Sequence, residues 1–248
     1  MHIPHDWQAE EQFLKDRVIL VTGAGNGIGA AVAKSCAHYG ASVILLDKSV
    51  RNLEQVYDAI ESAGGAPAAI YPMNLEGASE KDFLDLANTI EKEFGRLDGL
   101  LHNAAMLGAL IPVAHFETDL WFRILQVNLN APFLLTRACL NLLMKSPDAS
   151  ILFSSDTAGR HGKAYWGAYG VSKAAVENFM QTLADEMETN TRVRVNSLDP
   201  GPVATGLRNL AYPGENPQNV ASPEKVVRSH LYILGPDSKG ITGQQFED

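Results

Sequence analysis

Cysteine, basic residues and long apolar runs are all scarce in this sequence of 248 residues. The two cysteines, Cys36 and Cys139, both lie in segments with a helical pattern and suggest no disulfide framework. No apolar run approaches the ~20 residues of a membrane-spanning helix. The first residues have neither the basic start nor the apolar core of a signal peptide. We therefore predict a cytoplasmic protein with no membrane partner.

Acidic residues outnumber basic ones, because 20 Lys and Arg stand against 29 Asp and Glu, which gives a net charge of −9. An acidic chain of this kind disfavours nucleic acid or an anionic membrane as a partner. The histidines show no paired ligand spacing, so we expect no metal site. A Gly-x-Ser-x-Gly turn is also missing, which argues against a Ser-His-Asp hydrolase.

Strand and helix patterns alternate along the chain. Nearly continuous apolar runs, such as residues 17–21 and 41–46, are typical of parallel strands covered on both faces. Repeated strand–helix units predict a doubly wound Rossmann fold, with a parallel sheet of about seven strands and helices on both faces. Without a linker, residues 1–248 form a single dinucleotide-binding domain. The expected strands are 17–21, 41–46, 66–73, 97–101, 150–153, 192–198 and 241–246, and the expected helices are 30–39, 51–63, 79–94, 119–145 (with a kink or junction at Pro132), 168–188 and 222–234.

A glycine-rich turn, Thr22-Gly-Ala-Gly-Asn-Gly-Ile-Gly29, follows the first strand. Gly23, Gly27 and Gly29 lack Cβ atoms, so the backbone can turn tightly and approach a pyrophosphate at the N-terminus of the next helix. Glycine-rich turns without a ligand also occur, so the turn alone leaves both interpretations open. The turn lacks the Lys-Ser/Thr of a P-loop, which argues against nucleoside triphosphates.

Asp47 closes the second strand, about twenty residues past the glycine turn. A carboxylate at that place accepts both hydroxyls of an adenosine ribose and repels a 2′-phosphate, which favours NAD(H). Lys48 and Arg51 lie close enough to turn toward a 2′-phosphate, so NADP(H) stays open. The other interpretation of Asp47 is a solvated acid at a strand end.

Tyr169 and Lys173 lie one turn apart in an expected helix, so their side chains share a face. An ammonium beside a phenol lowers the tyrosine pKa from its reference value near ~10. Such a phenol is a plausible proton donor and acceptor at neutral pH. Taken alone, the pair could equally be an exposed tyrosine and lysine.

Together and in this order, the motifs resemble the short-chain dehydrogenase/reductase family, in its short single-domain form, over residues 17–246. The resemblance rests on the glycine turn, Asn103-Ala-Ala, Asn128 within Val-Asn-Leu-Asn, Tyr169-x-x-x-Lys173, and Pro200-Gly201 with Thr205. The segments Gly159-Arg-His-Gly and Trp166-Gly-Ala-Tyr resemble the YciK-like bacterial subgroup of poorly characterised oxidoreductases. The resemblance implies an oxidoreductase that transfers a hydride between NAD(P)(H) and a ketone or secondary alcohol.

The resemblance also implies roles for individual residues. Tyr169 would exchange a proton with the substrate oxygen, Lys173 would bind the nicotinamide ribose, and Asn128 would hold a water that links Lys173 to solvent. Residues 204–221, rich in Gly, Pro and Asn, would form a substrate lid. A homodimer or homotetramer would form through the apolar faces of two long helices. The implied cofactor contacts are Gly23, Asn26, Gly27, Ile28, Asp47, Asn74, Leu75, Asn103, Ala104, Tyr169, Lys173, Pro200, Gly201, Val203 and Thr205, and the expected interface residues are Phe133, Leu134, Leu140, Leu143, Val176, Phe179, Met180 and Leu183.

The segment before Tyr169 departs from the family pattern, because Asp156 stands where the family has its catalytic serine. An ionised Asp156 only accepts hydrogen bonds. It would also oppose a phenolate, since two like charges ~4 Å apart cost about 4 kcal/mol at an effective dielectric constant near 20. We place Ser155 among the catalytic residues, in the serine's role through a local backbone shift, and treat Asp156 and His161 as substrate-pocket candidates.

Two other outcomes stay open at this segment. A protonated Asp156 could donate to the substrate oxygen and give activity with an acidic optimum. Alternatively, the protein binds a dinucleotide with little or no catalysis and serves as a sensor or scaffold.

Overall fold

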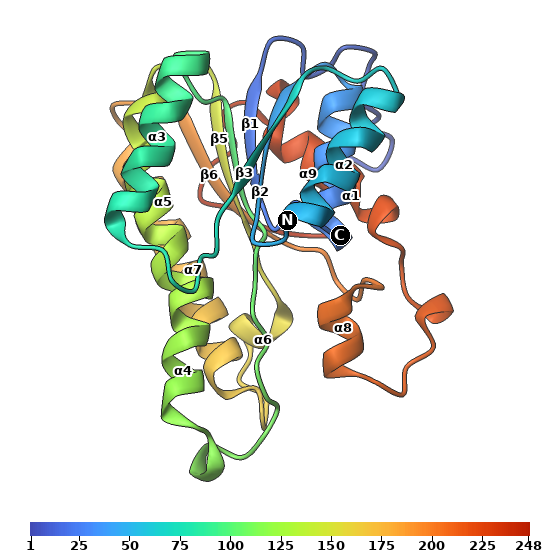
Figure 1. Ribbon diagram of the computed structural model, residues 1–248, viewed down its shortest axis with the longest axis vertical. Coiled ribbons are helices and arrows are strands. Elements are labelled where there is room, and N and C mark those ends of the chain that lie inside the picture. Colours follow the sequence, from blue (N-terminus) through green and yellow to red (C-terminus); the bar gives the residue numbers. More distant parts are fainter.

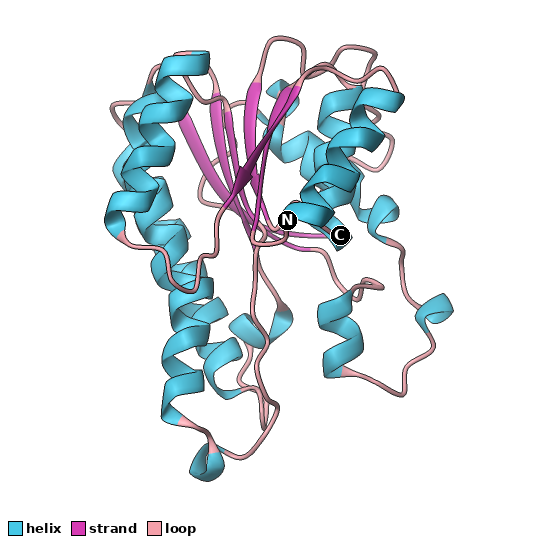
Figure 2. Cartoon of the chain, in the orientation of Figure 1, coloured by secondary structure: helices cyan, strands magenta, loops and turns pink.

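Seven strands, all paired in parallel, form one sheet with the strand order β3-β2-β1-β4-β5-β6-β7. A computed structural model, which describes residues 1–248, shows this sheet between two layers of helices (Figures 1 and 2). The architecture confirms the predicted doubly wound Rossmann fold. The strands are β1 (Val18–Thr22), β2 (Ser42–Asp47), β3 (Ala68–Pro72), β4 (Gly99–His102), β5 (Ala149–Ser154), β6 (Val193–Asp199) and β7 (Gln245–Glu247).

Each face of the sheet buries its own apolar cluster. Successive side chains of a strand point to opposite faces, so Ile19 and Val21 join one cluster while Val18 and Leu20 join the other. This double burial explains why the central strands read as unbroken apolar runs. One face is covered by α1 (Gly27–His38), α2 (Val50–Ser62) and α9 (Val227–Leu234), and the other by α3 (Glu80–Phe94), α5 (Ala131–Met144) and α7 (Gly167–Glu188) (Figure 1).

Three further helices lie beyond the carboxyl ends of the strands, at the lower end of the sheet in Figure 1. They are α4 (Thr118–Leu125), α6 (Thr157–Arg160) and α8 (Gly206–Ala211). The expected long helix 119–145 is therefore two helices, α4 and α5, joined by a π-helical segment (Gln126–Asn130) that ends just before Pro132. The sequence analysis did not predict α6, which has only four residues.

The lid and the last helix also differ from expectation. Residues 204–221 begin with α8 and contain a 3₁₀ turn (Pro217–Asn219), and a parallel bridge between Val203 and Ala221 joins their ends. The lid segment is thus partly helical and its two ends are paired, whereas the sequence analysis predicted a loop. A 3₁₀ turn (Pro223–Val226) precedes α9, so the α-helix proper begins four residues after Pro223.

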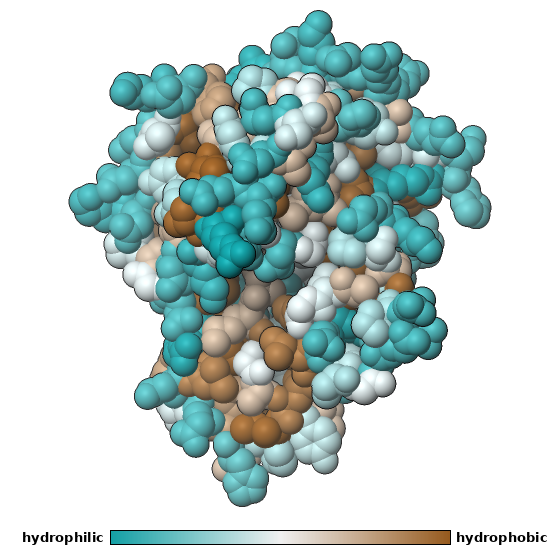
Figure 3. Space-filling model, turned by 45° about the vertical axis from the view of Figure 1, so that its right-hand side comes forward, coloured by the Kyte–Doolittle hydropathy of each residue, from teal (hydrophilic) through white to brown (hydrophobic).

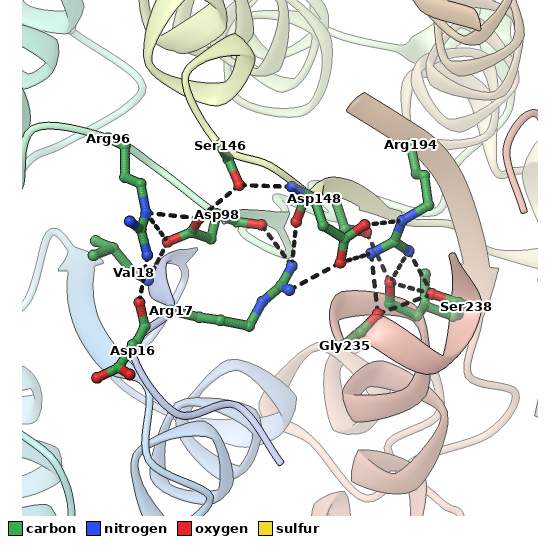
Figure 4. Close-up of polar contacts among 12 residues, drawn as sticks. Asp16, Arg17, Val18, Arg96, Asp98, Ser146, Asp148, Arg194, Gly235 and Ser238 are labelled. Carbon is green, nitrogen blue, oxygen red and sulfur yellow. Dashed lines mark hydrogen bonds and ion pairs between the residues drawn. The ribbon is translucent and has the colours of Figure 1, made fainter. Parts of the chain in front are cut away.

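A buried polar cluster closes the amino ends of the central strands (Figure 4). Arg194, only 4% exposed, donates to the carboxylate of Asp148 and to the carbonyl oxygens of Ile233 and Gly235. Arg17 donates to Asp148 as well, at 2.9 Å. Buried charges are tolerated only when they are paired and hydrogen-bonded, and these contacts meet that requirement. Hydrogen-bonded side chains therefore fill the amino ends of the central strands, which leaves the carboxyl ends as the place for a ligand site.

The apolar residues of α5 and α7 that were expected in a subunit interface are divided between the core and the surface. Leu143, Val176, Met180 and Leu183 are buried in the core of this chain, whereas Phe133 is 45% exposed. Association into a dimer or tetramer through these helices stays a prediction, as does the cytoplasmic location. No helix combines the length and the apolar composition that a membrane span requires.

Candidate active site

A cavity of about 690 Å³ lies at the carboxyl ends of the strands, where open parallel sheets bind their ligands. Figure 3 shows the surface hollowed near the middle of this side, with apolar side chains gathered below the hollow. The cavity brings together nearly all of the candidate residues. They are Gly23, Asn26, Gly27, Ile28, Asp47, Asn74, Leu75, Asn103, Ala104, Ser155, Asp156, Tyr169, Lys173, Pro200, Gly201, Val203 and Thr205.

The glycine turn has the backbone shape that an anion site needs. Gly23 and Gly27 adopt φ angles of +67° and +54°, which glycine tolerates best, and a Cβ on Gly29 would stand 2.2 Å from the carbonyl oxygen of Gly23. At the start of α1, Asn26 makes no side-chain cap and the first turn holds no acidic residue. The free N–H groups of this helix end therefore suit the pyrophosphate of a dinucleotide.

Asp47 faces the glycine turn from the end of β2. Its Oδ2 accepts a hydrogen bond from Gly25 N at 3.1 Å, and its Oδ1 accepts one from Ser49 N at 3.0 Å. Lys48 also lines the cavity, whereas Arg51 is exposed and lies outside the lining. The carboxylate is thus held beside the turn where an adenosine ribose would lie, and the neighbouring Lys48 lines the same cavity.

Tyr169 and Lys173 share the cavity-facing side of α7, as their spacing predicts. The hydroxyl of Tyr169 donates to Asp156 Oδ2 at 3.1 Å, and Lys173 Nζ donates to the carbonyl oxygen of Ser154 at 2.6 Å. Burial, followed by the charges of Asp156 and Asp199, raises the pKa of Tyr169 well above its ordinary value. The pKa of Tyr169 is thus raised, whereas the sequence analysis expected Lys173 to lower it. Burial in turn lowers the pKa of the Lys173 ammonium.

Asp156, rather than Ser155, meets the tyrosine. Asp156 caps α6 through its Oδ1, which accepts from Ala158 N at 2.7 Å, and its other oxygen is left for Tyr169. The hydroxyl of Ser155 instead donates to Glu177. Because β5 ends at Ser154 and the next two side chains diverge, the predicted backbone shift that would bring Ser155 to the tyrosine does not occur.

Glu177 is a buried acidic residue beside the site, and the sequence analysis missed it. Its carboxylate is 4% exposed and accepts hydrogen bonds from Ser155, from Ser197 at 2.6 Å, and from Arg160 and Gln245. These contacts join the ends of β5 and β6 to α6, α7 and β7. A signal was present in the sequence, because Glu177 lies four residues after Lys173 and so shares its helical face.

Two candidates lie outside the cavity lining. Asn128 sits in the π-helical segment, where its side chain donates to Met106 O and Ser172 Oγ and accepts from Met106 N. Its amide supports the cavity wall at Met106 and does not contact Lys173. His161 is exposed in the loop after α6 and does not line the cavity, so its assignment to the substrate pocket stays a prediction.

Aromatic and apolar side chains form the part of the cavity next to Tyr169, and the sequence analysis did not predict them. Trp166 and Tyr212 lie 6.1 Å apart by ring centroids, and Leu107 and Leu207 line the same region. Ser154 also lines the cavity, and its buried hydroxyl has no hydrogen-bond partner within the protein. A small molecule with an apolar body and one polar group suits such a lining.

Comparison with known proteins extends the resemblance noted in the sequence. Residues 17–216 match the family described as short chain dehydrogenase. The uncharacterized oxidoreductase YciK of Escherichia coli strain K12 is 41% identical over 241 residues, which cover 97% of this chain and 95% of the relative. A solved chain from Pseudomonas syringae, named as a short chain dehydrogenase, is 51% identical, covers 98% of each chain and superposes with a TM-score of 0.96. A similarly named chain from E. coli CFT073, complexed with NADPH, is 42% identical over 96% of this chain and 99% of its own, with a TM-score of 0.91.

Removing the charge of Asp156 should lower the pKa of Tyr169. In Asp156→Asn the carboxamide keeps the shape of the side chain but no longer opposes a phenolate, so the tyrosine should ionise at least about one pH unit lower than in the wild type. Absorbance titration of tyrosinate, with each protein referred to its own Tyr169→Phe variant, isolates this residue. A wild-type Tyr169 that ionises in the ordinary range, or an unchanged value in Asp156→Asn, would contradict the electrostatic account.

Proposed function

This chain belongs to the short-chain dehydrogenase family and is an oxidoreductase, and we propose that it transfers a hydride between NAD(P)(H) and a small ketone or secondary alcohol. The observation that carries the proposal is the placement of Tyr169 and Lys173 in one cavity with the glycine turn of α1. A proton-transfer group and a dinucleotide cradle in one cavity are the two parts that nicotinamide-dependent reduction needs.

Each part of the cavity would hold one part of the cofactor. The glycine turn would bind the pyrophosphate, Asn103 and Ala104 would flank a ribose, and Lys173 would bind the hydroxyls of the nicotinamide ribose. Asn74 and Leu75 would lie by the adenine, and Gly201, Val203 and Thr205 by the nicotinamide carboxamide. When bound, a reduced nicotinamide supplies the hydride.

Tyr169 would then supply the proton. Its raised pKa keeps the phenol protonated around neutral pH, so it acts as a donor to the oxygen of a carbonyl substrate. The same shift weakens it as a base, because alcohol oxidation needs the phenolate. The expected direction at neutral pH is therefore reduction, and oxidation gains as the pH rises.

Asp156 sets a further condition on carbonyl reduction. Ser155 is engaged by Glu177, so the group beside Tyr169 is a carboxyl, which donates a hydrogen bond only when it is protonated. Carbonyl reduction should accordingly favour acidic conditions. The alternative of a dinucleotide-binding protein without catalysis is not favoured, since the relatives are oxidoreductases and dehydrogenases.

Substitution of Tyr169 tests the proposal. With a panel of ketones and quinones, Tyr169→Phe should lower the rate of NAD(P)H consumption by about 10²–10⁴-fold, the usual contribution of a positioned proton donor. Cofactor binding, followed by quenching of tryptophan fluorescence, should persist. Tyr165→Phe is a matched control, because Tyr165 is 57% exposed and lies outside the cavity lining. Full activity of Tyr169→Phe would remove the tyrosine from the mechanism.

For the cofactor we propose a preference for NAD(H) over NADP(H). The negative charge of Asp47 is fixed beside the glycine turn by two backbone N–H groups, where it suits ribose hydroxyls and repels a 2′-phosphate. Lys48 is the one cation near it in the lining. The competing outcome is a preference for NADPH, which is the cofactor bound in the solved structure of the relative from E. coli CFT073.

The preference is measured as the ratio of kcat/KM for NADH to that for NADPH. In the wild type this ratio should exceed one, and Asp47→Ser should lower it at least about tenfold, because a charge-assisted hydrogen bond is lost and a repulsion is relieved. Asp58→Ser, an exposed substitution on α2, should leave the ratio unchanged. A wild type that prefers NADPH would show that Lys48 outweighs Asp47.

A further inference from the structure

We propose that the site reduces carbon–nitrogen double bonds in their protonated, iminium form, with Asp156 accepting the N–H of the substrate. This inference rests on the proposed function, because it uses the same cofactor and the same cavity. The observation behind it is the carboxylate that stands 3.1 Å from the hydroxyl of Tyr169, at the position where a carbonyl reductase presents a neutral donor.

The catalytic end of the cavity carries an excess of negative charge. Asp156 and Asp199 both line it, against the single ammonium of Lys173. Arg208 reaches the same region, but its guanidinium forms two 2.7 Å hydrogen bonds with Glu215 within the lid. Asp199 accepts hydrogen bonds from Thr157 and from Gly201 N, so structural contacts hold both of its oxygens. Asp156 Oδ1 is likewise held by Ala158 N, but Oδ2 is bonded to the hydroxyl of Tyr169 alone and is the carboxylate oxygen that a substrate would meet.

A ketone gains little from this arrangement. When it accepts a hydride, negative charge develops on its oxygen, and catalysis needs donors or positive charge aimed at that atom. An ionised Asp156 offers an acceptor and a negative charge instead, and it also competes for the proton of Tyr169. The carboxylate therefore opposes the transition state of carbonyl reduction.

With an iminium substrate, the negative charge of Asp156 and its role as a hydrogen-bond acceptor both become favourable. The N–H of the iminium donates to Asp156, and its positive charge pairs with the carboxylate. In the reaction, hydride passes from the reduced nicotinamide to the C=N carbon, the π pair becomes the nitrogen lone pair, and a neutral amine and an oxidised, cationic nicotinamide result. One positive charge is present in the site before and after the transfer, whereas the reduction of a ketone develops an alkoxide beside the carboxylate of Asp156. A neutral imine would first take one proton from water.

The walls next to Tyr169 suit the apolar body of a substrate. Trp166 and Tyr212 line this part of the cavity with aromatic surface. Both rings already carry cations of the protein, because Lys163 lies 4.9 Å and 5.3 Å from their centroids and the guanidinium of Arg208 lies 3.8 Å from that of Tyr212, so the charge of a substrate is left to Asp156. Together with Leu107 and Leu207, the rings point to small cyclic or aryl-substituted imines as the substrate class.

Two probes of the same shape test the preference, the cyclic imine 2-methyl-1-pyrroline and the ketone 2-methylcyclopentanone. At neutral pH and saturating NADH or NADPH, the wild type should reduce the imine with a kcat/KM at least about tenfold above that for the ketone. Asp156→Asn should lower imine turnover at least about tenfold, and Asp156→Ser should raise ketone turnover and reverse the preference. Asp58→Asn, an exposed change of the same type, should leave both rates unchanged.

A binding measurement gives a readout that does not depend on turnover. Protonated 2-methylpyrrolidine carries the charge and ring of the iminium but cannot accept a hydride, and 2-methylcyclopentanol is its neutral counterpart. Calorimetric titration into the protein, with and without oxidised cofactor, should show at least about tenfold tighter binding of the amine, and Asp156→Asn should abolish this difference.

The outcomes separate this inference from the proposed function. Equal binding of the two ligands, or an imine rate that Asp156→Asn leaves unchanged, overturns the role of Asp156. If Asp156→Ser reduces the ketone while the wild type shows no preference for the imine, the inference fails and the proposed function stands. If no protein reduces either probe although the cofactor binds, the inference fails, and the proposed function is decided separately by the panel of ketones and quinones.

Discussion

The parallel pairing of β1 with β4 is the constraint on which the site depends. Strand order runs outward in both directions from this pair, so the loops after β1 and β4 part and leave a crevice at the carboxyl edge. The hydroxyl of Thr22, at the end of β1, accepts hydrogen bonds from Asn103 N and Ala104 N, just after β4, at 3.0 Å and 3.1 Å. This contact fixes the two loops that would hold the cofactor relative to one another.

The buried carboxylate of Glu177 has a comparable effect at the other half of the site. It accepts hydrogen bonds from Ser155 after β5 and from Ser197 in β6, and so keeps the hydroxyl of Ser155 away from Tyr169. Asp156 is then left to cap α6 with one oxygen and to meet Tyr169 with the other. The negative charge of Asp156 therefore lies beside Tyr169 because the hydrogen bonds of Glu177, one helical turn after Lys173, hold Ser155 elsewhere.

Much of the fold and of the cofactor cradle was predictable, because local patterns encode them. The apolar runs, the glycine spacing and the four-residue separation of Tyr169 and Lys173 are each patterns of a few neighbouring residues. The glycine turn and the other site motifs lie next to the carboxyl ends of strands, where such a sheet binds its ligands. The direction of Ser155 was not predictable in this way, since it depends on Glu177, a partner 22 residues further along the chain. The pKa of Tyr169 was predicted in the wrong direction because spacing showed its helical neighbour but neither its burial nor its bond to Asp156.

The central claim is that the cavity at the strand edge is a hydride-transfer site. The most direct measurement uses NAD(P)H deuterated at the transferring position of nicotinamide C4, with a ketone or imine that the protein reduces, and follows the label by mass spectrometry. The account predicts one deuterium on the reacting carbon of the product for each cofactor oxidised, because hydride passes directly between the two bound molecules. Cofactor oxidation that leaves the product unlabelled, with the deuterium released to solvent, would contradict it.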